Sequence, residues 1–150
     1  MKLYHTILYN RPSMNPTRLV DLATAVVQNK NGQVLLLERN EKIFYKHWQF
    51  PEGKIKKTEN PKHALVRELT EELGGADTTV VSKLGEFSIS FRHPLGSRPQ
   101  LIKLVRITYL VKISGEINLS EEHSGWGWFT ASDALNLKLA PGVKEIIQII

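Results

Sequence analysis

The chain has 150 residues, of which 41% are hydrophobic and 23% charged, values typical of a single globular domain. It contains no cysteine, which excludes a disulfide framework and a thiolate metal site. No apolar run approaches the roughly 18 residues of a membrane span, and residues 1–12 lack the apolar segment of a secretory signal. We therefore expect one cytoplasmic domain over residues 1–150, without a membrane partner.

The formal net charge is +5, which favours a polyanionic substrate by electrostatic steering. A generally basic surface without functional meaning explains the same number equally well. No basic run with interleaved aromatic residues indicates a nucleic-acid platform, so we expect no duplex nucleic acid as a partner.

Apolar runs bounded by glycine, proline and asparagine clusters predict strands along the chain. They cover residues 2–9, 19–28, 33–39, 48–51, 80–92, 101–113 and 126–129. The turn signal Asn29-Lys30-Asn31-Gly32 predicts a hairpin between the two strands that flank it. Loops are expected between the strands, at residues 10–17, 40–47, 53–60, 93–100 and 114–125. Residues 1–18 are expected to be a variable N-terminal extension that packs on the sheet or on a second subunit.

One long central helix and one or two C-terminal helices are predicted. The longest starts after Asn60, a plausible N-cap, has Pro61 at its first position and stops at Gly74. A second follows Thr130 as far as residue 137, and the last follows Pro141. This order of elements indicates an α+β fold in which a mixed sheet packs between helices.

The longest helix has an acidic face. Arg67, Glu68, Glu71 and Glu72 fall within one arc, and an adjoining apolar arc carries Leu65, Val66, Leu69 and Leu73. Carboxylates this close repel one another, so the face is either fully solvated or it holds a cation. Clustered hard oxygen ligands suit Mg²⁺ or Mn²⁺.

The spacing around this face follows a longer pattern. Eight positions fit the Nudix box, G-x5-E-x7-R-E-U-x-E-E-x-G-U, in which U is a bulky aliphatic residue. The matching residues are Gly53, Glu59, Arg67, Glu68, Leu69, Glu71, Glu72 and Gly74. Gly75 replaces the final aliphatic residue, and Glu52 precedes Gly53 where the family often has another glycine. The sequence therefore resembles the Nudix hydrolases, which implies a Nudix-type α/β/α sandwich over residues 19–150.

The resemblance also implies roles for the box residues. Nudix enzymes use divalent cations to cleave a phosphoanhydride in a nucleoside diphosphate linked to another group. Glu68, Glu71 and Glu72 are implied as metal ligands, and the carbonyl group of Glu52 is a further candidate. Arg67 would orient a glutamate. Glu59 would brace the arrangement, Gly53 would allow close backbone approach, and Gly74 would end the helix.

Residues outside the box are candidates for the remaining roles. The spacing E-H-x4-W resembles an element of several Nudix subfamilies, which nominates Glu122 as a further metal ligand or general base, with Glu121 as the alternative. A solvated acidic loop is the competing interpretation, and we expect His123 to be structural or solvent-facing. Arg39 is a candidate phosphate contact. Tyr45 and Lys46 are the aromatic and basic candidates for substrate binding, whereas Phe44 and the tryptophans are expected in the core.

The sequence indicates the identity of the substrate less clearly than it indicates the phosphoanhydride bond that is cleaved. The segment Trp48-Gln49-Phe50-Pro51-Glu52-Gly53-Lys54 resembles the MutT-like group, which implies a nucleoside triphosphate pyrophosphohydrolase that releases monophosphate and pyrophosphate. Glu52 and the E-H-x4-W element instead resemble enzymes that act on dinucleoside polyphosphates or RNA 5′ ends. A non-catalytic nucleotide-sensing domain is the third hypothesis, and a homodimer is left open.

Overall fold

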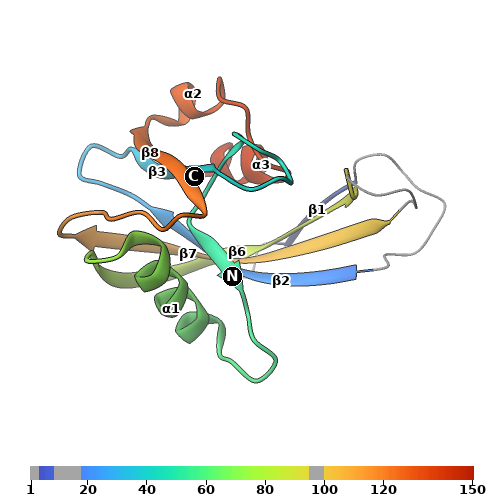
Figure 1. Ribbon diagram of the computed structural model, residues 1–150, viewed down its shortest axis with the longest axis horizontal. Helices are drawn as coiled ribbons and strands as arrows, with labels where there is room; N and C mark the ends of the chain where they lie inside the picture. Colours follow the sequence, from blue (N-terminus) through green and yellow to red (C-terminus); the bar gives the residue numbers. More distant parts are fainter. Residues whose placement is uncertain (1–3, 9–17, 95–99) are drawn as a thin grey trace.

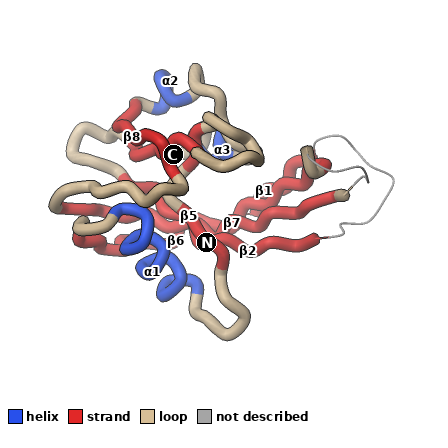
Figure 2. Tube along the Cα trace, viewed as in Figure 1, coloured by secondary structure: helices blue, strands red, loops and turns tan. Residues whose placement is uncertain are grey.

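The computed structural model describes residues 4–8, 18–94 and 100–150 of the chain. The described strands are β1 (Tyr4–Leu8), β2 (Arg18–Val27), β3 (Val34–Arg39), β4 (Trp48–Gln49), β5 (Glu52–Lys54), β6 (Asp77–Arg92), β7 (Leu101–Ser114) and β8 (His123–Phe129). The described helices are α1 (Pro61–Leu73), α2 (Ala131–Ala134) and α3 (Val143–Ile147). Figure 2 shows that strands and loops make up most of the chain.

The strands form two sheets. A five-stranded mixed sheet has the order β1-β6-β7-β2-β5, in which β1 runs parallel to β6 and β2 runs parallel to β7. A three-stranded antiparallel sheet has the order β4-β3-β8. The long pairing of β6 with β7 gives the molecule the extended ribbon at the right of Figure 1.

Helices cover opposite sides of this arrangement, with α1 on one side and α2 and α3 on the other (Figure 1). On the α1 side, Leu65 and Leu69 are buried against Ala25 of β2 and Leu35 of β3. On the other side, residues of α3 are buried with the next residues along the same strands, Val26 and Leu36. This alternation is the period of two that a strand imposes on its side chains. The α+β class with a mixed central sheet is therefore confirmed.

Several local predictions agree with the structure. α1 begins at Pro61, where the Asn60 side chain accepts a hydrogen bond from the Lys62 backbone N–H at 2.9 Å. Gly74 follows with a φ of 67°, as expected for the residue that ends a helix. The predicted edge strand near the N-terminus is also present as β1. None of the described helices is long and apolar enough to cross a membrane.

The predicted hairpin of residues 19–28 and 33–39 is wrong. β2 and β3 enter different sheets, and one isolated bridge, between Gln28 and Val34, connects the ends of the turn. β2 instead pairs along its length with β7, because ten parallel residue pairs outweigh a short local ladder. Local turn chemistry indicates a reversal of the chain and does not determine which strands pair.

Other boundaries shift as well. Residues 52–54 form β5 rather than a loop, β6 begins at Asp77, β8 begins at His123, and α2 ends at Ala134. Val66, assigned to the apolar arc of the helix, is 43% exposed. The predicted loop at residues 10–17 and most of the one at 93–100 lie outside the described residues, as does most of the N-terminal extension.

The packing of α1 predicts a large difference between two neighbouring truncations. Leu69 is fully buried, so Leu69→Ala should lower the free energy of unfolding by about 2–5 kcal/mol. Val66→Ala on the exposed side of the same helix should stay within about 0.5 kcal/mol of wild type. Urea unfolding followed by circular dichroism measures both. Equal losses would contradict the burial pattern of α1.

Candidate active site

Arg67 organises the acidic face of α1. Its Nε and Nη2 atoms each lie 2.8 Å from an oxygen of Glu59, which makes the ion pair bidentate, and Nη1 lies 2.7 Å from Glu68 Oε1. Nη2 also donates to the Lys54 carbonyl oxygen at 3.1 Å. One guanidinium therefore ties the loop before the helix, the end of β5 and a neighbouring glutamate together.

The ion pairs of Arg67 fix charge states as well as positions. The hydrogen bond from Arg67 lowers the pKa of Glu59 to about 2, with a smaller contribution from the Lys56 backbone N–H. The same contacts raise the pKa of Arg67. Glu59 is therefore ionised throughout the neutral range and can act as a permanent brace.

Gly53 and Glu68 are in close contact. A Cβ atom on residue 53 would overlap the carboxyl group of Glu68, so the glycine creates the space that the glutamate occupies. The Glu68 carboxylate is partly desolvated there, which raises its pKa despite the hydrogen bond from Arg67. The box glycine thus has a direct steric role at the site.

Glu72 is the buried carboxylate of the cluster, with only 3% of its surface exposed. Burial raises its pKa well above the ordinary range, and the charges of Glu52, Glu68 and Glu122 raise it further. The backbone N–H of Glu52 donates to the carboxylate, but Oε2 has no hydrogen-bond partner among the described residues. A buried carboxylate oxygen facing other carboxylates is costly unless a cation lies beside it.

Glu122 and His123 complete this cluster from the start of β8. One ligand atom each from Glu72, Glu122 and His123 lie within 4.8 Å of one another. A register shift between β3 and β8 aligns His123, rather than Ser124, with Arg39. His123 is 8% exposed, so of the two expectations for it, structural or solvent-facing, the second is wrong. Burial, with a contribution from the Arg39 charge, lowers the pKa of His123 to about 4, and its Nδ1 atom has no partner among the described residues.

The other predicted site residues divide into two groups. Arg39 lies in the same cavity as the cluster, where its Nη1 donates to Gln49 Oε1 at 2.8 Å and its Nε donates to the Ile43 carbonyl. Glu71 lies at the outer edge, 59% exposed, with its carboxylate 3.6 Å from Arg67. Tyr45 and Lys46 are not among the described residues that line a cavity here. Lys46 instead contacts Glu38 and Ser124.

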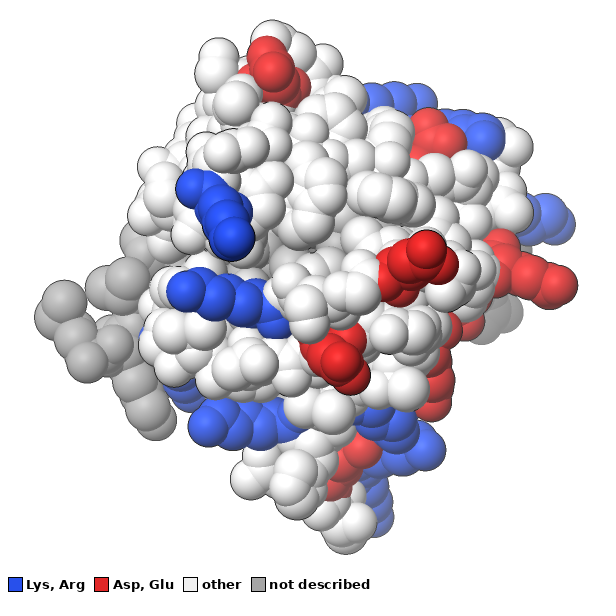
Figure 3. Space-filling model, turned by 90° about the vertical axis from the view of Figure 1, so that its left-hand side faces the viewer, with Lys and Arg blue, Asp and Glu red and all other residues white. Residues whose placement is uncertain are grey.

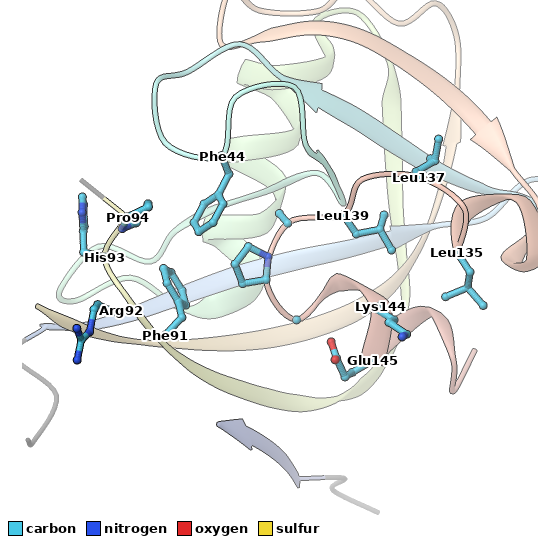
Figure 4. A pocket seen from close by; sticks show the side chains of 13 residues that line it. Phe44, Phe91, Arg92, His93, Pro94, Leu135, Leu137, Leu139, Lys144 and Glu145 are labelled. Atoms are coloured by element: carbon cyan, nitrogen blue, oxygen red, sulfur yellow. The ribbon is translucent and has the colours of Figure 1, made fainter. Parts of the chain in front are cut away.

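Two cavities meet at the site. The acidic cavity, of about 450 Å³, is lined by Glu52, Gly53, Glu68, Glu72, Glu122, His123 and Arg39, among others. The apolar cavity, of about 710 Å³, lies between the end of β6 and the C-terminal segment (Figure 4). Phe44, Phe91, His93, Ala140 and Pro141 line both, so the two form one cleft. The rings of Phe44 and Phe91 meet edge to face with centroids 5.4 Å apart.

The acidic cluster contrasts with the basic net charge of the chain. On the face in Figure 3, lysine and arginine side chains are separated by neutral and acidic surface rather than gathered into one patch. Arg67 is the cation in direct contact with Glu68 of the cluster. The basic residues that line the acidic cavity are Arg18, Arg39, Lys54 and Arg106.

A family model described as "NUDIX domain" matches residues 19–149. The chain belongs to the Nudix family. A CTP pyrophosphohydrolase of Escherichia coli (strain K12) is 27% identical over 132 residues, which span 87% of this chain and 90% of that protein. An RNA pyrophosphohydrolase of Alkalilimnicola ehrlichii is 34% identical over 116 residues, which span 69% of this chain and 62% of that protein.

Solved structures give the same result. The crystal structure of a MutT NUDIX hydrolase from Burkholderia pseudomallei matches with a TM-score of 0.69 at 25% identity and covers 87% of this chain and 96% of that one. This Nudix protein is thus a hydrolase that acts on diphosphate-linked substrates. Members of the family generally use divalent metal ions. The individual roles of the site residues stay predictions.

Sequence reasoning missed two residues of the Nudix site. For His123, the position directly after Glu122 is a usable signal of a place in the site. Arg106 carries no such signal, because a single arginine within an alternating strand is ordinarily a solvent-facing residue. Its burial beside Glu52 is a tertiary feature with no local signature.

The contact between Gly53 and Glu68 predicts a specific loss of activity. Gly53→Ala should displace the Glu68 carboxylate and lower kcat/KM for a diphosphate-linked substrate about 100-fold. Gly125→Ala is the matched control, because a Cβ atom there meets only ordinary contacts with Glu38. Steady-state hydrolysis measures the effect, with thermal melting to confirm folding. A folded Gly53→Ala variant with wild-type kcat/KM would show that the position of Glu68 is not critical.

Proposed function

We propose that this Nudix hydrolase is a metal-dependent nucleoside triphosphate pyrophosphohydrolase that releases a nucleoside monophosphate and pyrophosphate. The observation that carries the proposal is the joined cleft, in which an acidic cavity opens into an apolar one with aromatic side chains. A triphosphate with its cations fits the acidic end, and a flat base fits beside Phe44 and Phe91. The similarity to a CTP pyrophosphohydrolase over most of both chains supports this choice.

The donor atoms of the cluster fit a divalent cation. Glu72 Oε2 and His123 Nδ1 are buried polar atoms without partners among the described residues, which fits atoms that coordinate a metal. Glu52, through its carbonyl group, and Glu68, Glu71 and Glu122 are the further candidates. A bound cation would neutralise phosphate oxygens and favour the ionisation of a water molecule. We propose Mg²⁺ or Mn²⁺, because carboxylate and carbonyl oxygens form most of the candidate donor set.

The side chains of the cleft would share the remaining work. The exposed Glu122 carboxylate, at the wall of the acidic cavity, can accept the proton of the attacking water. Arg67 and Glu59 hold Glu68 in place, which keeps the cluster from relaxing under its own repulsion. The guanidinium of Arg39, at the end of β3 and paired with His123 of β8, would contact the phosphates of the substrate in the acidic cavity.

The second candidate is removal of pyrophosphate from RNA 5′ ends. The 34% identity to an RNA pyrophosphohydrolase favours it, and so does the residue in front of the box glycine. A dinucleoside polyphosphate would extend from the same cleft in the same way. A triphosphorylated RNA differs from a free nucleoside triphosphate in the chain that continues from its 3′ oxygen, whereas a dinucleoside polyphosphate carries a second nucleoside at the far end of its phosphate chain.

A substrate panel tests the proposal. The four ribonucleoside and four deoxyribonucleoside triphosphates, a dinucleoside tetraphosphate and a triphosphorylated RNA are each incubated with Mg²⁺ or with Mn²⁺. We expect the highest kcat/KM for a free triphosphate, with monophosphate and pyrophosphate as products. Preference for the RNA would replace this proposal with the second candidate. Tight nucleotide binding with no turnover of any substrate would indicate a sensing domain instead.

The position of Glu122 predicts a difference between adjacent acids. Glu122→Gln removes a proton acceptor and a ligand from the cavity wall, and should lower kcat roughly 100- to 1,000-fold. Glu121→Gln should change kcat less than about threefold, because Glu121 is not among the described residues lining the cavity. Both variants keep the volume of the side chain. The reverse ranking would move the role to Glu121.

A further inference from the structure

Arg106 is a buried cation between the two ends of the cleft. It lies in the middle of β7, and its side chain is only 3% exposed. Its Nε atom donates to Glu52 Oε1 at 2.9 Å, and its Nη1 atom donates to the Pro141 carbonyl oxygen at 2.7 Å. The guanidinium of Arg106 therefore joins β5, which contains Glu52, to the turn that precedes α3.

The contacts of Arg106 continue to the acidic cluster. The Glu52 side chain accepts from Arg106, and the Glu52 backbone N–H donates to the Glu72 carboxylate. The Thr24 hydroxyl is 3.5 Å from the same Glu52 oxygen that Arg106 contacts. A continuous path of polar contacts thus runs from the Pro141 carbonyl, at the apolar cavity, to Glu72, at the acidic cavity. Neither the Glu52 side chain nor Arg106 has a role in the proposed hydrolysis.

The turn at residues 140–142 is shaped around this arginine. Gly142 has a φ of +83°, which a residue with a side chain rarely adopts, and a Cβ atom there would lie 2.7 Å from Arg106 Nη1. Ala140 and Pro141 line both cavities, and Gly142 lines the apolar one. The turn therefore forms part of the wall where the cavities join. Arg106 fixes the position of the turn through its hydrogen bond to the Pro141 carbonyl oxygen.

A buried ion pair is weak as a source of stability, because desolvation of the two charges offsets their attraction. Such a pair does impose a defined geometry, since a planar guanidinium with two acceptors tolerates little displacement. We propose that Arg106 is a positioning residue that sets the distance between the acidic cluster and the turn at residues 140–142. It thereby selects substrates that carry a nucleoside at one end of the phosphate chain. This inference rests on the proposed function, because it takes the ligand to be a nucleotide.

The test separates the two ends of the cleft by using the two products. A nucleoside monophosphate probes the apolar end together with one phosphate, whereas inorganic pyrophosphate probes the acidic end alone. Isothermal titration calorimetry with Mg²⁺ gives a Kd for each, for all four ribonucleoside monophosphates. Because no turnover is needed, failure of the wild type to hydrolyse nucleotides would refute the proposed function without affecting this comparison.

The variants remove the contact without leaving a buried charge unpaired. In the double variant Glu52→Met/Arg106→Met, both charges are replaced by apolar chains of similar length, a change that buried pairs often tolerate. Gly142→Ala disturbs the same contact from the other side and leaves the ion pair in place. Lys83→Gln/Glu86→Gln is the control, because this ion pair is not among the described residues that line the cleft.

We expect the Kd of the preferred monophosphate to rise at least tenfold in both test variants, and that of pyrophosphate to change less than twofold. The control should keep both values. Equal weakening of the two ligands in a folded variant would overturn the proposal, because Arg106 would then only support the acidic cluster. Unchanged affinity for both, or no monophosphate binding by the wild type, would overturn it as well. Circular dichroism melting establishes folding, and Gly142→Ala gives the answer if the double variant does not fold.

Discussion

The site depends on the Glu72 carboxylate, whose ionised form is destabilised by burial beside other carboxylates. Glu72 is buried, faces three other acids and has an oxygen without a partner among the described residues. Two nearby features offset part of this cost: the backbone N–H of Glu52 donates to the Glu72 carboxylate, and Arg67 pairs with the neighbouring Glu68. A bound cation would relieve the remaining repulsion, so the electrostatics of the cluster support the proposed metal site independently of family membership.

The core explains how such a cluster keeps its geometry. α1 is anchored by leucines that contact both sheets, so its acidic face cannot rotate away from β5. The last residues of α1 are also held in place, because the backbone N–H groups of Asn118 and Ser120 donate to the carbonyl oxygens of Leu73 and Glu72. The acids come from three separate segments, yet each is attached to a well-packed element. Rigid placement of this kind is what metal and phosphate chemistry requires.

The sequence was most informative where the relevant physics is local. The start of α1, its acidic face and its end at Gly74 follow from capping, helical spacing and the freedom of glycine, and all are present. Pairing of β2 with β7 could not be predicted in this way, because it joins segments about eighty residues apart while the turn chemistry favoured β3. His123 and Arg106 could not be placed in this way either. Residue 123 lies in the predicted loop at 114–125, whereas β8 begins there and its register shift aligns His123 with Arg39. An isolated arginine in a strand gives no sign of burial.

The register shift between β3 and β8 has a consequence for how this site can diverge. Because the extra residue in β8 aligns His123 with Arg39, the face on which the histidine lies is determined by chain length as well as by side-chain chemistry. An insertion or deletion at Ser124 would move the register by one residue and turn His123 to the other face. Substitutions at 122 and 123 leave that register intact. A change of length ahead of the bulge, in the loop at residues 115–121, would leave the alignment of His123 with Arg39 unchanged.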